Sequence, residues 1–313
     1  MSVVALCGGI GGAKLALGLY HALPAADLTL IGNTGDDFTH LGFSISPDLD
    51  TVCYTLSGLA DQVRGWGRGD ESWNFMEGVR QLGGPDWFNL GDRDLALHAL
   101  RSDALRRGES LTEITARIAG QMGITARLLP MSDDPVRTVI ATPDGWLAFQ
   151  EYFVRDRCAP KVVGVRYEGA EAALANPAAL AALADPATEA IIICPSNPVL
   201  SIDPILSVPG IRAALAKATA PVVAVSPLIG GLAVKGPTAE IMREMGLGAT
   251  AASVCAHYGD ILNGFVLDEA DAAEHGALPV ATSVTRTLMT TLDDRIALAR
   301  FTLEFARDLG KRP

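Results

Sequence analysis

A glycine-rich segment close to the N-terminus constrains the fold of this chain more than any other feature. A short, partly β-branched apolar run, residues 3–6, leads directly into GGIGGAK, residues 8–14, and a mostly apolar helical stretch follows. The order strand, glycine loop, helix is typical of the first unit of an α/β sheet. Backbone amides of such a loop, with the field of the following helix N-terminus, can hold a phosphate group. The phosphate-binding candidates are Gly8, Gly9, Gly11, Gly12 and Lys14.

This loop fits neither of the two standard nucleotide-binding patterns. A dinucleotide fingerprint that starts at Gly9 needs a glycine at position 14, where the chain has Lys14. A P-loop that starts at Gly8 accommodates Lys14, but Ala13 and Leu15 stand where it needs a glycine and a serine or threonine. The loop therefore predicts phosphate binding of another kind, and a tight turn that binds no ligand stays an alternative.

Later segments extend the α/β pattern. Two fully apolar runs, residues 190–194 and 222–225, lack the alternation of a half-exposed strand, which predicts strands buried on both faces of a parallel sheet. Further strands are expected at 28–31 and 264–267, and helices at 170–183, 239–245 and 293–309. We therefore expect an α/β fold with a doubly wound, mostly parallel, Rossmann-like sheet.

The middle of the chain has a different character, which indicates an insertion. Helices are expected at 72–82, 94–107 and 111–122, and a hairpin where 136–142 and 146–154 flank Pro143-Asp144-Gly145. Ser110 and Glu113 have the spacing of a capping box. We expect one domain, residues 1–313, with a Rossmann-like core at 1–50 and 160–313 and a helical and hairpin insertion at 51–159.

Aspartates gather where the second predicted strand ends. Asp36 and Asp37 follow that strand, and Asp48 and Asp50 come one short loop later. Open α/β sheets bind ligands at the carboxyl ends of their strands, and magnesium commonly bridges one or two carboxylates to substrate phosphates. The segment therefore predicts a metal site at Asp36 and Asp48. Helix caps and Asx turns stay an alternative, above all for Asp50.

For two further acidic segments, the sequence supports a functional role and a purely structural role equally. Asp92 and Arg93 lie in GDRD, where a helix cap is the structural alternative, and Asp133 lies in SDDP, where a turn is. His98 falls one helical turn after Asp94 on the same face. Spacing supports no Ser-His-Asp arrangement and no zinc motif.

Charge and composition exclude some partners. The formal net charge is −11, which gives no general attraction to nucleic acid or to an anionic membrane. A phosphate must then be held locally, by loop amides, a few basic side chains or a metal. The 5 cysteines include no CxxC pair and fit reduced thiols. We expect no signal peptide and no transmembrane segment, and hence a cytoplasmic location.

In combination these motifs resemble those of the 2-phospho-L-lactate transferases. The shared segments follow the family's order from about residue 3 to residue 268. They are GGIGGAK, GNTGDD, SPDLDT, WFNLGDRDLALH, LLPMSDDPV, PSNPVLSI, VPGIR, and VSPLIGG with KGP following. The combination is far more specific than the glycine loop alone.

The resemblance implies an enzyme of the phosphotransferase class. Members of the family transfer a phosphorylated three-carbon acid from its guanosine diphosphate ester to the deazaflavin Fo. GMP is released, and the product is a precursor of coenzyme F-420. An actinobacterial branch is similar but uses an enolpyruvyl ester. The sequence does not choose among 2-phospholactate, phosphoenolpyruvate and 3-phosphoglycerate as the activated acid, and a homodimer is only the general expectation for such a chain.

The resemblance also implies roles for individual residues. It implies Mg²⁺ at Asp36 and Asp48. The residues expected at the deazaflavin are Asp37, Asp50, Asp92 and Asp133. The nucleotide ester is expected to contact Ser196, Asn197 and Ser226, which sit at strand ends, besides the glycine loop. The chemistry of the reaction itself suggests the catalytic candidates: Asp37 would take the hydroxyl proton, and Arg93 or Lys14 would stabilise charge on the phosphoryl oxygens.

Other interpretations stay open. A related branch of this fold resembles nucleotide-sugar-binding regulatory proteins, which share the glycine loop and the NTGDD-like segment, but GDRD and SDDPV favour the transferase. A nicotinamide dehydrogenase is disfavoured by Lys14 at the third glycine position. Trp66, Trp73 and Trp87 offer a wall for the flat deazaflavin, although ordinary core packing explains any single one better.

Overall fold

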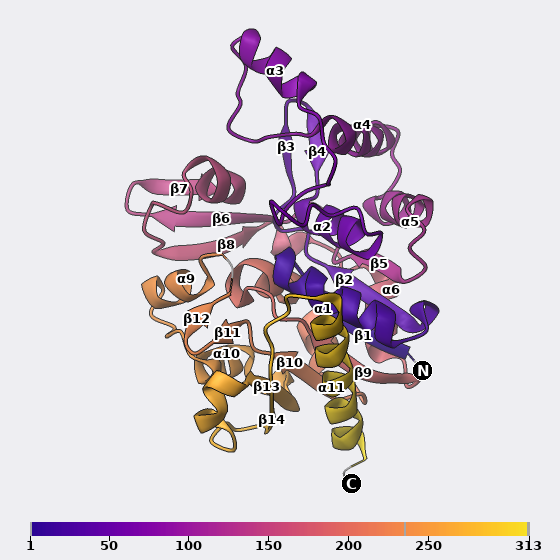
Figure 1. Ribbon diagram of the computed structural model, residues 1–313, viewed down its shortest axis with the longest axis vertical. Helices are drawn as coiled ribbons and strands as arrows, with labels where there is room; N and C mark the ends of the chain where they lie inside the picture. The colour runs from indigo at the N-terminus through magenta and orange to yellow at the C-terminus, as the bar shows by residue number, and fades with distance from the viewer. Residues whose placement is uncertain (1, 235, 312–313) are drawn as a thin grey trace.

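The computed structural model describes residues 2–234 and 236–311. In these residues, seven strands form a central sheet in the order β14-β13-β10-β9-β1-β2-β5, and every pairing in it is parallel (Figure 1). The strands are β14 (Ala281–Thr285), β13 (Gly264–Asp268), β10 (Val222–Val225), β9 (Thr188–Ile193), β1 (Ser2–Cys7), β2 (Leu28–Gly32) and β5 (Arg127–Pro130). The predicted doubly wound α/β fold is confirmed.

Helices cover both faces of this sheet because alternate side chains of the central strand point in opposite directions. Val4 and Leu6 of β1 enter one core, whereas Val3, Ala5 and Cys7 enter the other. The first core is closed by α6 (Pro177–Ala184), α7 (Asp203–Ser207), α8 (Ile211–Lys217) and α10 (Ala251–Tyr258). The second is closed by α1 (Gly9–Ala22), α2 (Pro47–Leu56), α5 (Leu111–Gln121) and α11 (Leu292–Gly310).

The predicted hairpin belongs to a second, three-stranded sheet. Strand β6 (Arg137–Thr142) pairs antiparallel with β7 (Gly145–Ala148) and with β8 (Gly164–Glu168). The second arm is shorter than expected, because residues 149–154 leave the sheet and the helical turn η2 (Glu151–Arg155) follows. This sheet lies beside the central one, on the side of α9 (Thr238–Glu244) (Figure 1).

The rest of the insertion extends away from the core. Helices α3 (Asn74–Gln81) and α4 (Asp92–Arg106) accompany the short hairpin of β3 (Phe38–His40) and β4 (Phe43–Ile45), at the top of Figure 1. Four strands depart from the boundaries expected for the insertion, residues 51–159. Strands β3 and β4 come before that range but accompany its helices α3 and α4. Strand β5 lies within that range but pairs with β2 in the central sheet, and β8 lies outside it but completes the hairpin sheet.

Most predicted helices form where expected, with one exception that proline explains. The expected helix at 170–183 is a 3-10 turn, η3 (Ala170–Ala172), followed by α6, which begins at Pro177. Proline has no amide hydrogen to donate within a helix, and its ring clashes with a carbonyl of the preceding turn. A helix therefore cannot continue through Pro177. The Asn176 side chain caps α6 instead, by accepting from the amides of residues 178 and 179. The capping box of Ser110 and Glu113 is confirmed at the start of α5.

The remaining elements are short. They are the 3-10 turns η1 (Ala25–Asp27), η5 (Gly259–Ile261) and η6 (Glu269–Glu274), the π turn η4 (Pro198–Ile202), and the strands β11 (Leu228–Ile229) and β12 (Leu232–Ala233). Among the described residues, no single helix is both long enough and apolar enough to cross a membrane. One pair, Pro198–Ser207 with Ile211–Lys217, reaches that length and composition only together, and its two helices are bent by 89°. Lys235 of the KGP motif lies outside the described residues.

Candidate active site

The main cavity lies at the switch point of the sheet. The chain runs from β1 outward through β2 on one side, and from β9 outward through β10 on the other, so the strand order reverses between β1 and β9. Ligands of open α/β sheets bind outside the carboxyl ends of strands at such a point. A cavity of about 430 Å³ opens there, between segments that follow these strands and residues of the insertion.

The glycine loop forms one wall of this cavity. Helix α1 begins at Gly9, directly after β1, and its N-cap is Gly8, which has no side chain to occupy the first-turn amides. A Cβ at Gly11 would lie 2.3 Å from the carbonyl oxygen of Pro195, and a Cβ at Gly8 would lie 2.6 Å from Oδ2 of Asp48. Glycine is therefore required where the loop meets the segments after β9 and β2.

Four of the five predicted loop residues line the cavity. They are Gly8, Gly9, Gly11 and Lys14. Gly12 packs against the segment after β9, where a Cβ would lie 2.4 Å from Oγ of Ser196. Lys14 Nζ donates a hydrogen bond to the carbonyl of Met289, 3.0 Å away, so the segment before α11 holds this ammonium group at the cavity wall.

The three polar residues predicted at strand ends also line the cavity, and each also stabilises its own loop. Ser196 Oγ donates to the carbonyl of Gly8 over 2.8 Å, which ties the segment after β9 to the glycine loop. Asn197 Oδ1 accepts from the backbone amides of residues 199 and 200 at the start of η4. Ser226 Oγ donates to the carbonyl of residue 228, 3.0 Å away. Their placement at one sheet edge is as predicted.

Asp36 and Asp48 form an acidic pair in the cavity wall. Asp48 Oδ1 accepts from the amide of Gly9 at 2.8 Å, and its Oδ2 accepts from Asn33 Nδ2 at 2.9 Å. Burial raises the pKa of Asp48 to about 6, although these hydrogen bonds oppose the shift. Burial, and then the charge of Asp48, raise the pKa of Asp36 well above its usual range. Two carboxylates are thus held close together in a place that disfavours their charge.

This pair fits a divalent cation. Oδ1 of Asp36 is buried and has no hydrogen-bond partner among the described residues. Within the same part of the chain, no group of three or more histidine, cysteine or acidic side chains is placed to hold a metal. A cation at Asp36 and Asp48 would therefore complete its shell with water and substrate phosphate, which is the binding mode that magnesium favours.

Asp37 is buried behind the cavity and is not among its described lining residues. Its Oδ2 accepts from Ser46 Oγ at 2.7 Å. Burial raises the pKa of Asp37 to about 7, while the hydrogen bond from Ser46 and the charge of Arg101 act in the opposite direction. The structure thus places this predicted catalytic residue one layer away from the ligand space.

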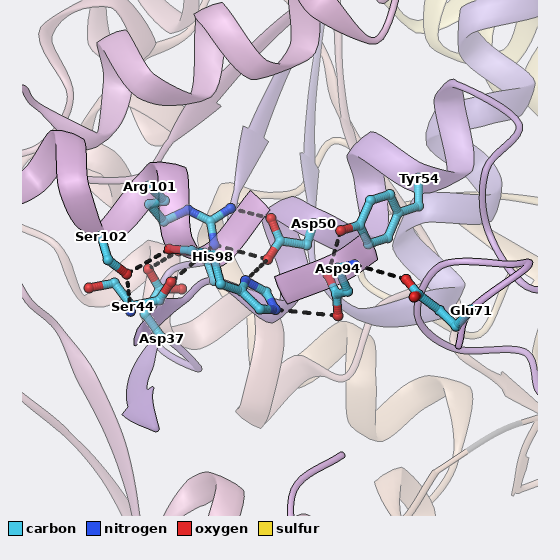
Figure 2. Close-up of polar contacts among 10 residues, drawn as sticks. Asp37, Ser44, Asp50, Tyr54, Glu71, Asp94, His98, Arg101 and Ser102 are labelled. Atoms are coloured by element: carbon cyan, nitrogen blue, oxygen red, sulfur yellow. Dashed lines mark hydrogen bonds and ion pairs between the residues drawn. The ribbon is translucent and has the colours of Figure 1, made fainter. Parts of the chain in front are cut away.

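Polar residues of α2 and α4 form a network beside the cavity (Figure 2). Asp50 pairs with both terminal nitrogens of Arg101, one of them at 3.0 Å. The His98 ring lies between two carboxylates, with Nδ1 3.7 Å from Asp50 and Nε2 3.3 Å from Asp94, and the Tyr54 hydroxyl donates to Asp94. Asp50, Tyr54, Asp94 and His98 line the cavity, and Arg101 lies behind them.

Sequence reasoning missed most of this network. It expected Asp50 at the site and noted His98 one helical turn after Asp94, but it gave no role to His98, Tyr54 or Arg101. Asp94, His98 and Arg101 follow one another at i, i+4 and i+7 in α4, which places them on one helix face. That spacing is the signal that could have found them.

Three predicted residues lie elsewhere. None of Asp92, Arg93 and Asp133 is among the described residues that line the main cavity. Asp92 accepts four hydrogen bonds from residues 72–75 and so holds the start of α3, and Asp133 accepts from the amide and hydroxyl of Thr112 at the start of α5. Arg93 is exposed and borders a separate surface depression beside residues 58–70. A structural role, which the sequence left as the alternative for both residues, therefore describes Asp92 and Asp133.

Comparison with known proteins gives the family. The model of the family described as 2-phospho-L-lactate transferase CofD matches residues 3–291. The chain is 42% identical to the phosphoenolpyruvate transferase of Streptomyces griseus subsp. griseus over 99% of both chains. It is 40% identical to the 2-phospho-L-lactate transferase of Methanosarcina mazei over 96% of this chain and 99% of that protein.

Solved structures agree on the fold. A crystal structure of a UPF0052 family member from Bacillus halodurans superposes with a TM-score of 0.62 over 97% of this chain and 100% of that one. The sequences are 17% identical, so this likeness concerns the fold alone. The family match confirms the expected transferase over the regulatory and dehydrogenase alternatives. The chain belongs to the 2-phospho-L-lactate transferase CofD family.

Proposed function

We propose that this transferase moves a phosphorylated three-carbon acid from its guanosine diphosphate ester to the deazaflavin Fo, releasing GMP and forming a precursor of coenzyme F-420. The observation that carries the proposal is the buried Asp36–Asp48 pair beside the glycine loop, at the switch point of the sheet. A diphosphate ester is the kind of ligand that such a loop and a carboxylate-held cation bind together. The names of the relatives support phospholactate or phosphoenolpyruvate as the acid.

The residues of the core wall would hold the donor. Gly9, Ile10 and Gly11 at the start of α1 line the cavity, where the field of the helix N-terminus favours an anion, and the Lys14 ammonium group adds a positive charge there. Mg²⁺ at Asp36 and Asp48 would neutralise the diphosphate and the charge that develops on departing GMP. Lys14 and the loop amides, rather than the exposed Arg93, are therefore the groups proposed to stabilise the transferred phosphoryl oxygens.

The reaction requires one bond to form and one to break. A hydroxyl oxygen of Fo attacks the phosphorus that carries the acid, the bond from that phosphorus to the GMP oxygen breaks, and the hydroxyl proton passes to solvent water. Phosphoryl transfer depends mainly on positioning and electrostatics. The acceptor hydroxyl would approach from the wall that carries Asp50, Asp94 and His98, because the wall of the glycine loop is taken by the diphosphate.

The test is a product analysis. Purified protein is incubated with Mg²⁺, Fo and each of the three candidate esters, and GMP and the deazaflavin product are identified by mass spectrometry. We expect GMP and a phospho-acid-charged deazaflavin in equal amounts, with one ester preferred. GMP release that proceeds equally well without Fo would show hydrolysis instead of transfer.

A further inference from the structure

Of the chain's four tryptophans, all in described positions, Trp66 is the one that lines the main cavity. It lies in the loop between α2 and α3, and its side chain is 48% exposed. Trp87 packs instead against His40 and Phe88, with ring centroids 5.0 and 5.8 Å apart. A half-exposed indole at a cavity wall has apolar area available for a ligand, whereas a ring within an aromatic cluster has less.

The loop that carries Trp66 is closed on itself. The Asp61 amide donates to the Gly67 carbonyl at 3.0 Å, and the Gly69 amide donates to the Leu59 carbonyl at 2.8 Å. Oδ1 of Asp61 accepts from the amides of residues 63 and 64 at 2.8 and 2.7 Å. Backbone bonds at both ends therefore give Trp66 a defined place at the cavity.

Arg64 fixes the ring within this loop. Its guanidinium group lies 5.1 Å from the Trp66 ring centroid and 4.9 Å from that of Trp73. The same group pairs with Oδ2 of Asp61 at 2.9 Å and donates to the carbonyl of Arg68 at 2.6 Å. A planar cation held from two sides and placed against two indoles restricts the orientation of both.

The position of Trp66 relates it to the acceptor and not to the nucleotide. The glycine loop and the segments after β9 and β10 form the core wall, where a doubly wound sheet binds its nucleotide. Trp66 belongs to the insertion, which also contributes Tyr54, Phe88 and Asp94 to the cavity lining. This wall combines aromatic faces with carboxylates, which suits a flat ring system that carries a hydroxylated chain.

We infer that Trp66 stacks on the ring system of the deazaflavin acceptor and that Arg64 is the positioning residue that presents it. This inference rests on the proposed function. The stacking accounts for acceptor affinity only, so the guanosine side of the cavity is independent of Trp66.

The chain supplies a matched control. Trp146 is 50% exposed and has Arg166 at 4.0 Å from its ring centroid, but this pair lies on the hairpin sheet, away from the described lining of the cavity. The experiment is equilibrium binding of Fo and, separately, of GMP, measured by titration calorimetry in Mg²⁺. The variants are Trp66→Leu, Arg64→Gln, Trp146→Leu and Arg166→Gln.

We expect Trp66→Leu to weaken Fo binding about tenfold, the scale of one lost aromatic stack, with GMP binding unchanged. Arg64→Gln should weaken Fo binding by a smaller factor, also without effect on GMP, and both control variants should match the wild type.

Unchanged Fo binding in Trp66→Leu, or a loss of GMP binding instead, would overturn the inference. Unchanged Fo binding in Arg64→Gln would overturn the role of Arg64. A wild-type protein that binds GMP but not Fo would overturn the proposed function as well.

Discussion

Arg101 of α4 clamps Asp50 of α2 through both oxygens of the carboxylate, directly behind the cavity wall. Both residues are buried, at 3% and 5% exposure. Burial is the largest single influence on the pKa of Arg101 and acts to lower it. The charge of Asp50 acts in the opposite direction, and the net effect is a raised pKa. This pair joins α2, whose first turn also carries Asp48, to α4 of the insertion.

Removing one partner of this pair is expected to destabilise the fold. Arg101→Leu would leave the Asp50 carboxylate buried without its cation, which typically costs about 3–5 kcal/mol of unfolding free energy. Urea unfolding followed by circular dichroism measures the loss. Arg107→Leu is the matched control, because Arg107 in the same part of the chain pairs with Asp103 on the surface, and exposed pairs contribute little. Equal stability of the two variants would contradict the structural role of Asp50–Arg101.

Asp48→Asn tests the acidic pair in two ways. Burial raises the pKa of Asp48, so its charge opposes folding when no cation is present, whereas an amide can accept only one of the two hydrogen bonds that Asp48 accepts. These effects oppose each other, and the thermal midpoint of Asp48→Asn in EDTA is expected to stay close to that of the wild type. Loss of the cation's contribution to the transition state is expected to lower transferase activity about 100-fold or more.

For the account to hold, Asp48→Asn must lose transferase activity without a matching loss of thermal stability in EDTA. In wild-type protein with GMP, Mg²⁺ is expected to raise the thermal midpoint, whereas in Asp48→Asn that increase should disappear. Asp144→Asn, on the exposed hairpin turn, is the control for removal of one negative charge and should behave as wild type. Near-normal turnover in Asp48→Asn would remove the argument for a cation at this site.

His257 gives a pH dependence of known sign. Its Nε2 lies 2.7 Å from Oδ2 of Asp203, and this hydrogen bond raises the pKa of His257 above its usual 6.5, although burial opposes the shift. A raised histidine pKa in the folded state contributes stability that is fully present below the unfolded value. That stability is lost as the pH rises through the folded value.

The measurement compares unfolding free energies at several pH values from 5 to 9. The difference between wild type and His257→Gln is expected to be largest at the acidic end and to shrink as the pH rises. His21→Gln, on the exposed surface of α1, is the control. A difference that grows with pH would contradict the assignment of the His257–Asp203 ion pair.

Local patterns in the sequence predicted much of the fold for physical reasons. The capping box of Ser110 and Glu113 needs only three residues of spacing, and the glycine loop after β1 requires glycine because of the close approach at Gly11. Strand β5 was missed because its four residues are too few to show a period and end in Pro130. The break at Pro177 shows proline overriding an alanine-rich helical composition.

The site was harder to predict because its residues meet only through the tertiary fold. Asp48 and Asp92 both begin helices, yet only the first faces the cavity, since α2 packs beside α1 whereas Asp92 caps the outlying α3. Physical reasoning about the phosphoryl charge offered Arg93 as a stabilising group, whereas the structure puts it on the surface beside another depression. No sequence spacing shows which of four tryptophans borders the cavity.

A metal-substituted crystal structure tests the central claim most directly. Crystals grown with GMP and Mn²⁺ in place of Mg²⁺ would give an anomalous scattering signal at any bound cation. We expect one strong peak between the carboxylates of Asp36 and Asp48 and the phosphate of GMP, with the phosphate against the amides at the start of α1. Ordered GMP in the cavity with no anomalous peak at Asp36 and Asp48, at saturating Mn²⁺, would contradict the account.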